Sequence, residues 1–296
     1  MLRSVALPVV VAVVVIGAVS CSAEDDGAYT TLPPIRTTST SSTTTTSTLP
    51  EGQRQFYEIK PGETLSMIAR QFQVPLQAII DLNAIEGELS GIELKGRSIV
   101  IGAMTKHGEV ANSQVVKDAL PVLAEVPGSI GDPAVRHRGT IGGSLANNDP
   151  NADYPAAVLG LGATIITNKR RIAADEFFKG MFETALAADE IITKVQFPIA
   201  KKAAYEKFKH PASGFALVGV FVSKRGSDIR VAVTGAGSNG VFRVASFEEA
   251  LKKRFSAKSI EGMTIPTEGM NSDIHGSAEY RAHLVAVLAR RALAKA

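Results

Sequence analysis

A tract of threonine, serine and proline between Gly27 and Pro50 separates the N-terminal segment of this chain of 296 residues from the part that can fold. The tract includes an unbroken threonine run from Thr43 to Thr46 and has almost no apolar side chains to bury. Without apolar burial nothing offsets the loss of chain entropy on folding. We therefore predict a disordered linker over residues 22–55, with the folded domains after it.

The segment before this tract has the pattern of an export signal. A short, positively charged N-terminus precedes an apolar run from Val5 to Val19. This run is shorter than a typical membrane-spanning helix. The run ends at Ala18-Val-Ser-Cys21, which resembles a bacterial lipobox and holds the only cysteine of the chain. The resemblance implies a signal peptide with a lipobox over residues 1–21, lipidation of Cys21, and an exported, membrane-anchored lipoprotein or cell-envelope protein. The alternatives are a cleaved secretory signal, an uncleaved anchor, and a cytoplasmic protein if the signal is not used.

Residues 56–101 predict a small module in the order strand, helix, helix and strand. An alternating segment leads into a Pro61-Gly62 turn, two helical patterns follow, and Ser98–Ile101 reads as a closing strand. The pattern resembles a LysM domain over nearly its full length, which implies binding to N-acetylglucosamine in peptidoglycan or chitin. By this resemblance the glycan-binding groove comprises Gly62, Glu63, Thr64, Leu65, Asn83 and Ala84. The alternative is that Gly62 and Asn83 only shape turns.

Composition excludes several classes of function. The chain is 45% hydrophobic, which suffices for two or three cores, and its net charge of +3 is scattered rather than gathered in a nucleic-acid-binding patch. One cysteine excludes a disulfide framework and a self-contained iron–sulfur cluster. The five histidines show no zinc spacing, so no metal site is predicted. The glycines between Gly235 and Gly240 superficially match a dinucleotide fingerprint, but a strand-like segment follows them, so we interpret them as a hairpin-type loop.

The segment from Ile130 to Pro155 is the most informative part of the sequence for predicting a ligand-binding site. Gly142 and Gly143 remove side chains where a backbone must turn tightly or approach a ligand closely. Hydroxyl donors flank this pair at Thr140 and Ser144, and a carboxylate follows at Asp153. Amides, hydroxyls and a nearby carboxylate suit a phosphate held beside a ribose or a ring edge. The alternative, for the Gly-Gly pair taken alone, is that it only forms a turn and binds no ligand.

This segment closely resembles the flavin-binding segment of the medium subunit of carbon monoxide dehydrogenase and xanthine dehydrogenase-type molybdenum hydroxylases. The resemblance runs from Ile101 to the C-terminus and weakens after Leu251. It implies FAD as cofactor, partners that carry iron–sulfur and molybdenum centres, and an electron-relay role with no catalytic acid or base of its own. The implied FAD-binding residues are Thr140, Ile141, Gly142, Gly143, Ser144, Asp153, Ile130, Ile192 and Lys209.

The patterns predict an α+β fold with three folded parts: the β-α-α-β LysM module, a partial FAD-binding fold over residues 102–200, and an antiparallel sheet with helices over residues 201–296. Strands are expected over 163–167, 191–197, 204–209, 216–224, 229–234 and 241–244. Helices are expected from residue 110 to 123, over 154–161, over 247–255 and over 278–296, with a mixture of helix and turn over 177–186.

Family members carry an earlier flavin subdomain with a second glycine-rich phosphate loop, and residues 56–101 occupy its place here. Loss of several charge-assisted hydrogen bonds to a diphosphate weakens binding by powers of ten, so FAD binding is expected to be weak or absent. We also expect residues 102–296 to pack poorly against residues 56–101. Three interpretations stay open: a flavin subunit fused to a LysM module, a cell-wall-binding lipoprotein whose flavin half is non-functional, and a gene fusion or mis-assembly.

Overall fold

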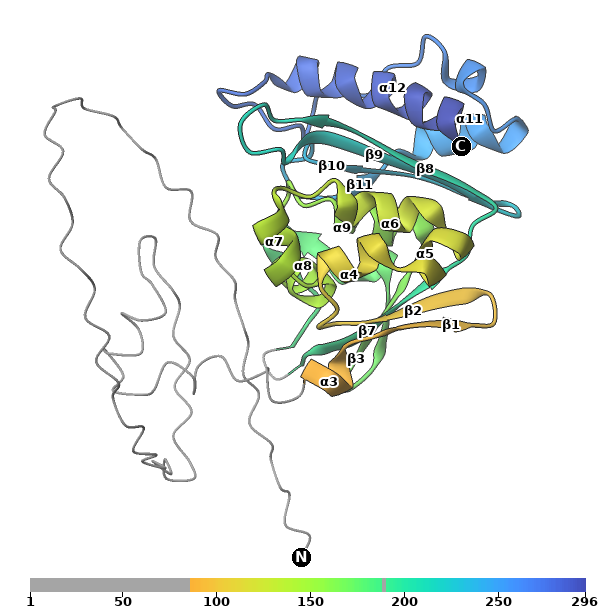
Figure 1. Ribbon diagram of the computed structural model, residues 1–296. Coiled ribbons are helices and arrows are strands. Elements are labelled where there is room, and N and C mark those ends of the chain that lie inside the picture. The colour runs from red at the N-terminus through yellow and green to blue at the C-terminus, as the bar shows by residue number, and fades with distance from the viewer. Residues whose placement is uncertain (1–85, 188–189) are drawn as a thin grey trace, which may run out of the picture. The chain divides into compact units, whose positions relative to one another are not determined.

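A computed structural model describes residues 86–187 and 190–296 of the chain (Figure 1). The predictions for the signal peptide, the linker and the LysM residues before Glu86 therefore lie outside the described residues. Helix α3 (Glu86–Leu89) and strand β1 (Ile92–Lys95) come first. They are followed by β2 (Ser98–Gly102), α4 (His107–Asn112), α5 (Gln114–Ala119), α6 (Pro121–Gly128), α7 (Pro133–Arg138), α8 (Ile141–Asn147), α9 (Tyr154–Leu161), β3 (Thr164–Thr167), β4 (Arg171–Ala173), α10 (Ala174–Phe177), β5 (Phe178–Gly180), β6 (Glu183–Thr184) and β7 (Ile192–Pro198). The C-terminal part contains β8 (Lys202–Lys209), β9 (Ala216–Arg225), β10 (Asp228–Thr234), β11 (Phe242–Arg243), α11 (Ala245–Lys253), the 3-10 helix η2 (Ala257–Ile260) and α12 (Ala278–Lys295).

These elements form alternating layers of helix and sheet, as Figure 1 shows. Helices α11 and α12 cover one face of a four-stranded sheet, whose strand order is β11-β10-β9-β8. Helices α6 and α9 pack on its other face. Helix α9 also contacts β7, which belongs to a five-stranded sheet of order β1-β2-β7-β3-β4. The expected α+β class with antiparallel sheets is confirmed.

The five-stranded sheet is antiparallel throughout, and β2 lies inside it. Strand β2 pairs with β1 on one side and with β7 on the other. The closing strand predicted for the LysM module therefore forms, but one of its two partners, β7, lies in the predicted FAD-binding part over residues 102–200. Ile99 and Ile101 are fully buried in the core that the helices share with this sheet. The expectation of poor packing is thus wrong for residues 86–101.

Strand β9 is the centre of the four-stranded sheet because it is apolar on both faces. Its residues from Ala216 to Ser223 are all buried. Val220 and Val222 face the core beneath α11 and α12, whereas Phe221 faces the core beneath α9. Near-continuous apolar runs are typical of strands covered on both sides. A strand with this composition therefore requires a layer of helices on each face.

Most strands and three of the helices form where the sequence predicts them. Strands β3 and β7 to β11 lie at their predicted positions within a few residues, as do α9, α11 and α12. The single helix that was expected to start at residue 110 is instead three, α4, α5 and α6, because Ser113 caps α5 and Pro121 begins α6. The mixed helix and turn expected over residues 177–186 is largely wrong, since β5 and β6 form a hairpin there.

The glycine-rich loop after β10 is a hairpin connection, as predicted. Strands β10 and β11 pair antiparallel on either side of it, so no helix follows the glycines. Gly235 has a φ of 80°, and a Cβ atom at this position would lie 2.3 Å from the carbonyl oxygen of Ala216. The glycine thus serves a close backbone approach, and the dinucleotide interpretation is excluded for this loop.

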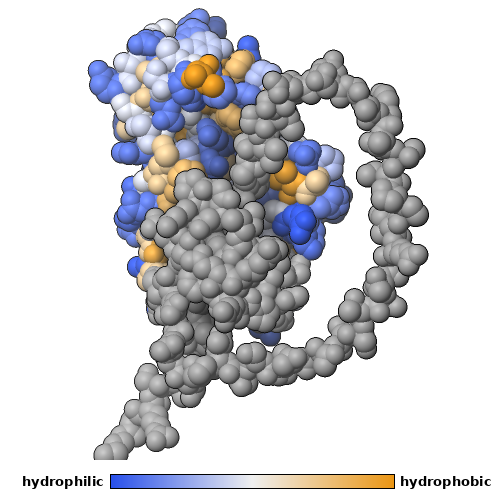
Figure 2. Space-filling view, turned by 90° about the vertical axis from the view of Figure 1, so that its left-hand side faces the viewer, coloured by the Kyte–Doolittle hydropathy of each residue, from blue (hydrophilic) through white to orange (hydrophobic). Residues whose placement is uncertain are grey.

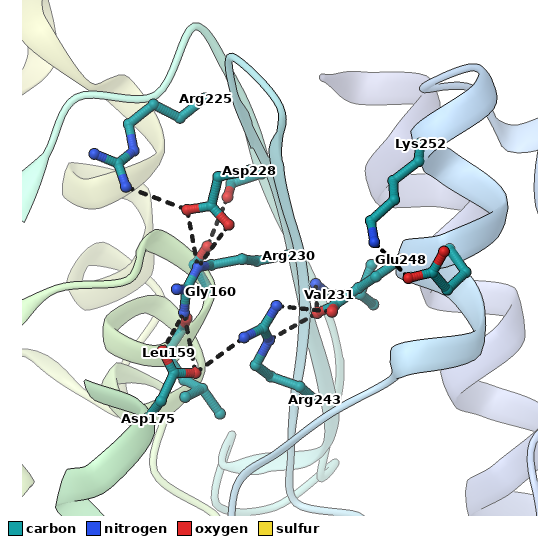
Figure 3. A network of polar contacts seen from close by, with 12 residues as sticks. Leu159, Gly160, Asp175, Arg225, Asp228, Arg230, Val231, Arg243, Glu248 and Lys252 are labelled. Atoms are coloured by element: carbon teal, nitrogen blue, oxygen red, sulfur yellow. Dashed lines mark hydrogen bonds and ion pairs between the residues drawn. The ribbon is translucent and has the colours of Figure 1, made fainter. Parts of the chain in front are cut away.

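A network of charged side chains joins the two parts of the fold (Figure 3). The Asp175 carboxylate, on α10, accepts hydrogen bonds from Arg230 at 2.9 Å and from Arg243 at 3.0 Å, on β10 and β11. Arg243 also donates to Glu248 of α11, and Glu248 accepts from the Val231 amide at 2.9 Å. Because Glu248 is buried, its charge is held by partners rather than by water. The network therefore holds residues of the predicted FAD-binding part, residues 102–200, against the four-stranded C-terminal sheet.

The surface turned toward the viewer in Figure 2 is a mosaic. Among the coloured residues, apolar areas alternate with polar ones over short distances. Scattered apolar side chains of this kind are ordinary for a folded chain. The coloured residues of this face therefore form no single broad apolar area.

The contact between α9 and β9 allows no side chain at Gly160. A Cβ atom there would lie 2.5 Å from Cδ1 of Phe221. We predict that Gly160→Ala lowers the free energy of unfolding by about 1–3 kcal/mol, because overpacking outweighs the gain in helix propensity. Urea denaturation measures this change. Gly128→Ala is the control, since the nearest atom to its Cβ is 3.8 Å away, and an equal loss in both variants would contradict the prediction.

Candidate cofactor site

The predicted cofactor segment is the beginning of a helix. Thr140 is the N-cap of α8, and its side-chain oxygen accepts a hydrogen bond from the Gly143 amide at 3.1 Å. Thr140 also bridges to Lys106 as an isolated β-type pair. The segment is thus an extended residue followed directly by a helical turn, in which Ile141 and Gly142 are buried.

The amides of this turn bind within the chain. Ile141 donates to the Thr105 carbonyl at 3.2 Å, and Gly142 donates to the Ala103 carbonyl at 2.8 Å. The Ser144 amide donates to the Thr140 carbonyl at 3.0 Å. In the described residues the turn therefore offers a ligand its side chains and outer surface rather than a set of free amides.

Gly142 serves a close approach between backbones. A Cβ atom at this position would lie 2.6 Å from the Ala103 Cβ and 2.8 Å from the Ala103 carbonyl oxygen. The glycine is therefore required for α8 to pack on the end of β2. The sequence predicted such an approach toward a ligand, whereas the structure shows it toward the chain's own backbone.

Buried polar atoms without a partner gather around this segment. Among the described residues they include Nδ1 of His107, Oδ1 of Asn148 and the Tyr154 hydroxyl. The rings of His107 and Tyr154 contact each other, with centroids 5.3 Å apart. Burial lowers the pKa of His107 to about 4, so its imidazole is neutral at physiological pH. Buried donors and acceptors of this kind fit a polar heterocyclic ligand such as FAD.

Asp153, predicted to face the cofactor, belongs to a buried polar cluster. The Tyr205 hydroxyl donates to its carboxylate at 2.6 Å, and the Lys207 ammonium donates to it at 3.0 Å. Lys207 also donates to the Ser129 carbonyl at 3.0 Å. Burial raises the pKa of Asp153, and the Lys207 charge and the Tyr205 hydrogen bond act in the opposite direction. The cluster links α9, β8 and the end of α6.

Sequence reasoning missed Tyr205 and Lys207 and named Lys209 instead. Alternate residues of a strand share a face, so Tyr205 and Lys207 point to one side of β8, whereas the register with β9 shifts between Phe208 and Lys209. Lys207 is buried, whereas Lys209 is exposed at the end of the strand and contributes to the electrostatic field at Asp153. The missed signal was the combination of this alternation with the position of Asp153 at the start of α9.

The remaining predicted residues are distributed over the same core. Ile192 is buried at the start of β7, and the half-buried Ile130 packs against the same cluster. The predicted glycan-binding residues and Cys21 lie outside the described residues. In the part of the chain that the structure describes, no group of three or more metal-ligating side chains is present.

Glu190 fixes the chain just before Ile192. Its carboxylate accepts hydrogen bonds from Arg170 at 2.9 Å, from the Thr167 hydroxyl at 2.7 Å and from the Ala187 amide at 3.0 Å. The Arg170 hydrogen bond is the largest cause that lowers the pKa of Glu190 to about 2. Glu190 is thus ionised and positions the beginning of β7.

Two adjoining domain families match the chain. The FAD binding domain in molybdopterin dehydrogenase matches residues 37–200, and the CO dehydrogenase flavoprotein C-terminal domain matches residues 203–296. The chain belongs to the family of FAD-binding subunits of molybdenum hydroxylases. The match begins before Ile101, where the sequence analysis placed the start of the resemblance.

Relatives and solved structures agree with this assignment. The carbon monoxide dehydrogenase medium chain of Hydrogenophaga pseudoflava is 32% identical, over 77% of this chain and 84% of the relative. The nicotine 6-hydroxylase medium subunit of Paenarthrobacter nicotinovorans is 35% identical, over 80% of this chain and 88% of the relative. The structure of the Hydrogenophaga pseudoflava carbon monoxide dehydrogenase that lacks the Mo-pyranopterin moiety matches with a TM-score of 0.61 at 32% identity, over 70% of this chain and 78% of that chain. FAD is the cofactor of this chain.

The expectation of an exported, lipid-anchored envelope protein is wrong. The relatives matched over most of their length are medium chains of dehydrogenase and hydroxylase enzymes, which contradicts an envelope lipoprotein. Within residues 86–187 and 190–296, no helix combines the length and apolar character that a membrane crossing requires.

Removal of Lys207 tests the buried cluster. We predict that Lys207→Met lowers the free energy of unfolding by about 3–5 kcal/mol, because Asp153 is left buried without its cation. Adding Asp153→Asn to this variant should restore part of the loss, since the unpaired charge is gone. Chemical denaturation followed by circular dichroism measures both. Lys209→Met is the exposed control, and a loss for Lys207→Met no larger than for this control would contradict the prediction.

Proposed function

We propose that this chain is the electron-transfer flavin subunit of a molybdenum-hydroxylase-type oxidoreductase, relaying electrons between a partner's iron–sulfur centre and an acceptor. The observation that carries the proposal is the run from Thr140 to Asp153, which sits in a chain that matches both flavin-subunit domains in order. The relatives are named as medium chains or complex subunits, which supports partner subunits with molybdenum and iron–sulfur centres.

FAD supplies the redox chemistry when it is bound, and the residues of this chain bind, orient and shield it. The Thr140 and Ser144 side chains, on the first turn of α8, would hold the cofactor at one end. The Asp153 and Lys207 pair sets the charge near the beginning of α9, while Tyr205 keeps the carboxylate oriented. A neutral His107 behind the segment adds no charge to the site. No general acid or base is required of these residues.

Ser144→Ala separates cofactor binding from folding. Alanine favours a helix, so we predict unchanged or higher stability, but about five- to tenfold weaker binding of FAD through the lost hydroxyl. Titration of the purified full chain with FAD, followed by flavin fluorescence, measures the affinity. Ser246→Ala, an exposed serine in α11, is the matched control. Wild-type protein that binds no FAD would refute the proposal, and equal affinity in Ser144→Ala would refute the role of Ser144.

The pattern of residues 56–101 favours a second proposal, a glycan-binding LysM module fused to the flavin subunit. Its support is the Pro61-Gly62-Glu63-Thr64-Leu65 motif followed by Asn83. The match of the FAD-binding domain from residue 37 and the place of β2 in the five-stranded sheet both weigh against an independent module that ends at Ile101.

Retention of the full chain on insoluble peptidoglycan tests this second proposal. We predict weak retention that falls several-fold in the double variant Glu63→Ala, Asn83→Ala, because both predicted loops lose polar contacts. The Ser246→Ala chain is the control. Equal retention of the double variant and the control, or no retention of either, would exclude the LysM function.

A further inference from the structure

Two non-glycine residues have a left-handed backbone in the part of the chain that the structure describes. They are Asn148, with a φ of 46°, and Phe182, with a φ of 56°. Asparagine tolerates this region, and Asn148 has the ordinary role of C-cap of α8. A bulky aromatic residue does not, and strain of this kind persists where the surrounding structure enforces it. Phe182 is therefore the outlier among these backbone conformations.

A backbone hydrogen bond joins the two left-handed residues. The Phe182 amide donates to the Asn148 carbonyl at 3.2 Å. The Asn148 side-chain amide donates to the carbonyls of Gly180 at 2.8 Å and Glu183 at 2.9 Å, one on each strand of the β5–β6 hairpin. The end of α8 thus clamps both strands of the hairpin and imposes the conformation of the tip between them.

This tip displays apolar side chains to solvent. Met181 is 45% exposed and Phe182 is 58% exposed. The tip therefore combines a left-handed aromatic residue, which the hydrogen bonds of Asn148 hold in place, with apolar side chains that remain exposed. Strain and exposed apolar surface at one position are typical of a binding site. We expect a ligand to cover the exposed apolar side chains.

We propose that the Phe182 side chain is a contact for a planar ring of the bound FAD. The proposal rests on the proposed function and assigns it a further cofactor-binding residue. Helix α8 has seven residues, so it places the tip only about 10 Å along its axis from Thr140. An elongated dinucleotide with a ring system at each end spans that distance.

The chemistry of the tip fits such a ring. An exposed phenyl group stacks on flat heterocycles or meets them edge-on. Beside it, Asn148 is 1% exposed, and its Oδ1 atom has no hydrogen-bond partner among the described residues. An aromatic face next to a buried acceptor suits a heterocycle that carries an N–H donor on its edge. Both the flavin and the adenine of FAD have this property.

Phe182→Gly distinguishes a cofactor contact from a merely structural residue. Glycine adopts a left-handed φ without strain, so we expect the melting temperature of the cofactor-free full chain to rise by about 2–4 °C. We expect FAD affinity, measured by fluorescence titration, to fall about tenfold in the same variant. Phe182→Tyr keeps the ring and should bind FAD within about twofold of the wild type. Phe182→Asn tolerates the same backbone and should reproduce the loss of affinity.

Ile274→Gly is the matched control, since Ile274 is 95% exposed in a loop and its backbone is not left-handed. It should raise neither the melting temperature nor the dissociation constant. If wild-type protein binds FAD and Phe182→Gly binds it equally well, the assignment of Phe182 is overturned while the flavin function stands. If the wild type binds no FAD, the proposed function fails, and this inference fails with it.

Discussion

The fold depends on helix α9, which is buried on every side between two sheets. All of its residues from Tyr154 to Leu161 are buried, and it contacts strands of both the four-stranded and the five-stranded sheet. A helix without a polar face cannot lie at a surface, so both sheets must close over it. Gly160 lets it approach Phe221 of β9, and Arg230 donates a hydrogen bond to the Leu159 carbonyl near the end of the helix.

The carboxylate at the beginning of α9 makes burial of the helix unfavourable unless another residue pairs with that charge. Asp153 immediately precedes the helix and is almost fully buried. A buried carboxylate is tolerated only when it is paired and hydrogen-bonded, and Lys207 and Tyr205 of β8 provide this. The requirement couples the C-terminal sheet to the segment that carries the flavin-type motif. The cofactor segment, α9 and β8 therefore form one unit, and the family assignment gives that unit a function.

Helix α8 extends the same unit to the β5–β6 hairpin. Its N-terminus is fixed to the end of β2 through Gly142 and Ala103, and its C-terminus clamps the hairpin through Asn148. A short helix held at both ends by backbone contacts is a rigid support for side chains that must meet a ligand. The hydrogen bonds from the end of α8 hold Phe182, at the tip of the hairpin, in its left-handed conformation.

The sequence by itself determined the periodic elements and the family. Strands β7 to β11 and helix α9 follow from local patterns, and the segment from Thr140 to Asp153 indicated FAD before any fold was known. Only the tertiary structure decided which side chains meet: Lys207 rather than Lys209 pairs with Asp153, the Gly142 backbone meets Ala103, and Ser98–Gly102 joins β7 rather than closing a separate module. The physical reason is that propensity and periodicity act over a few residues, whereas these contacts join residues about 40–100 positions apart. Burial of a charge or a strand edge selects its partner only when the whole chain is packed.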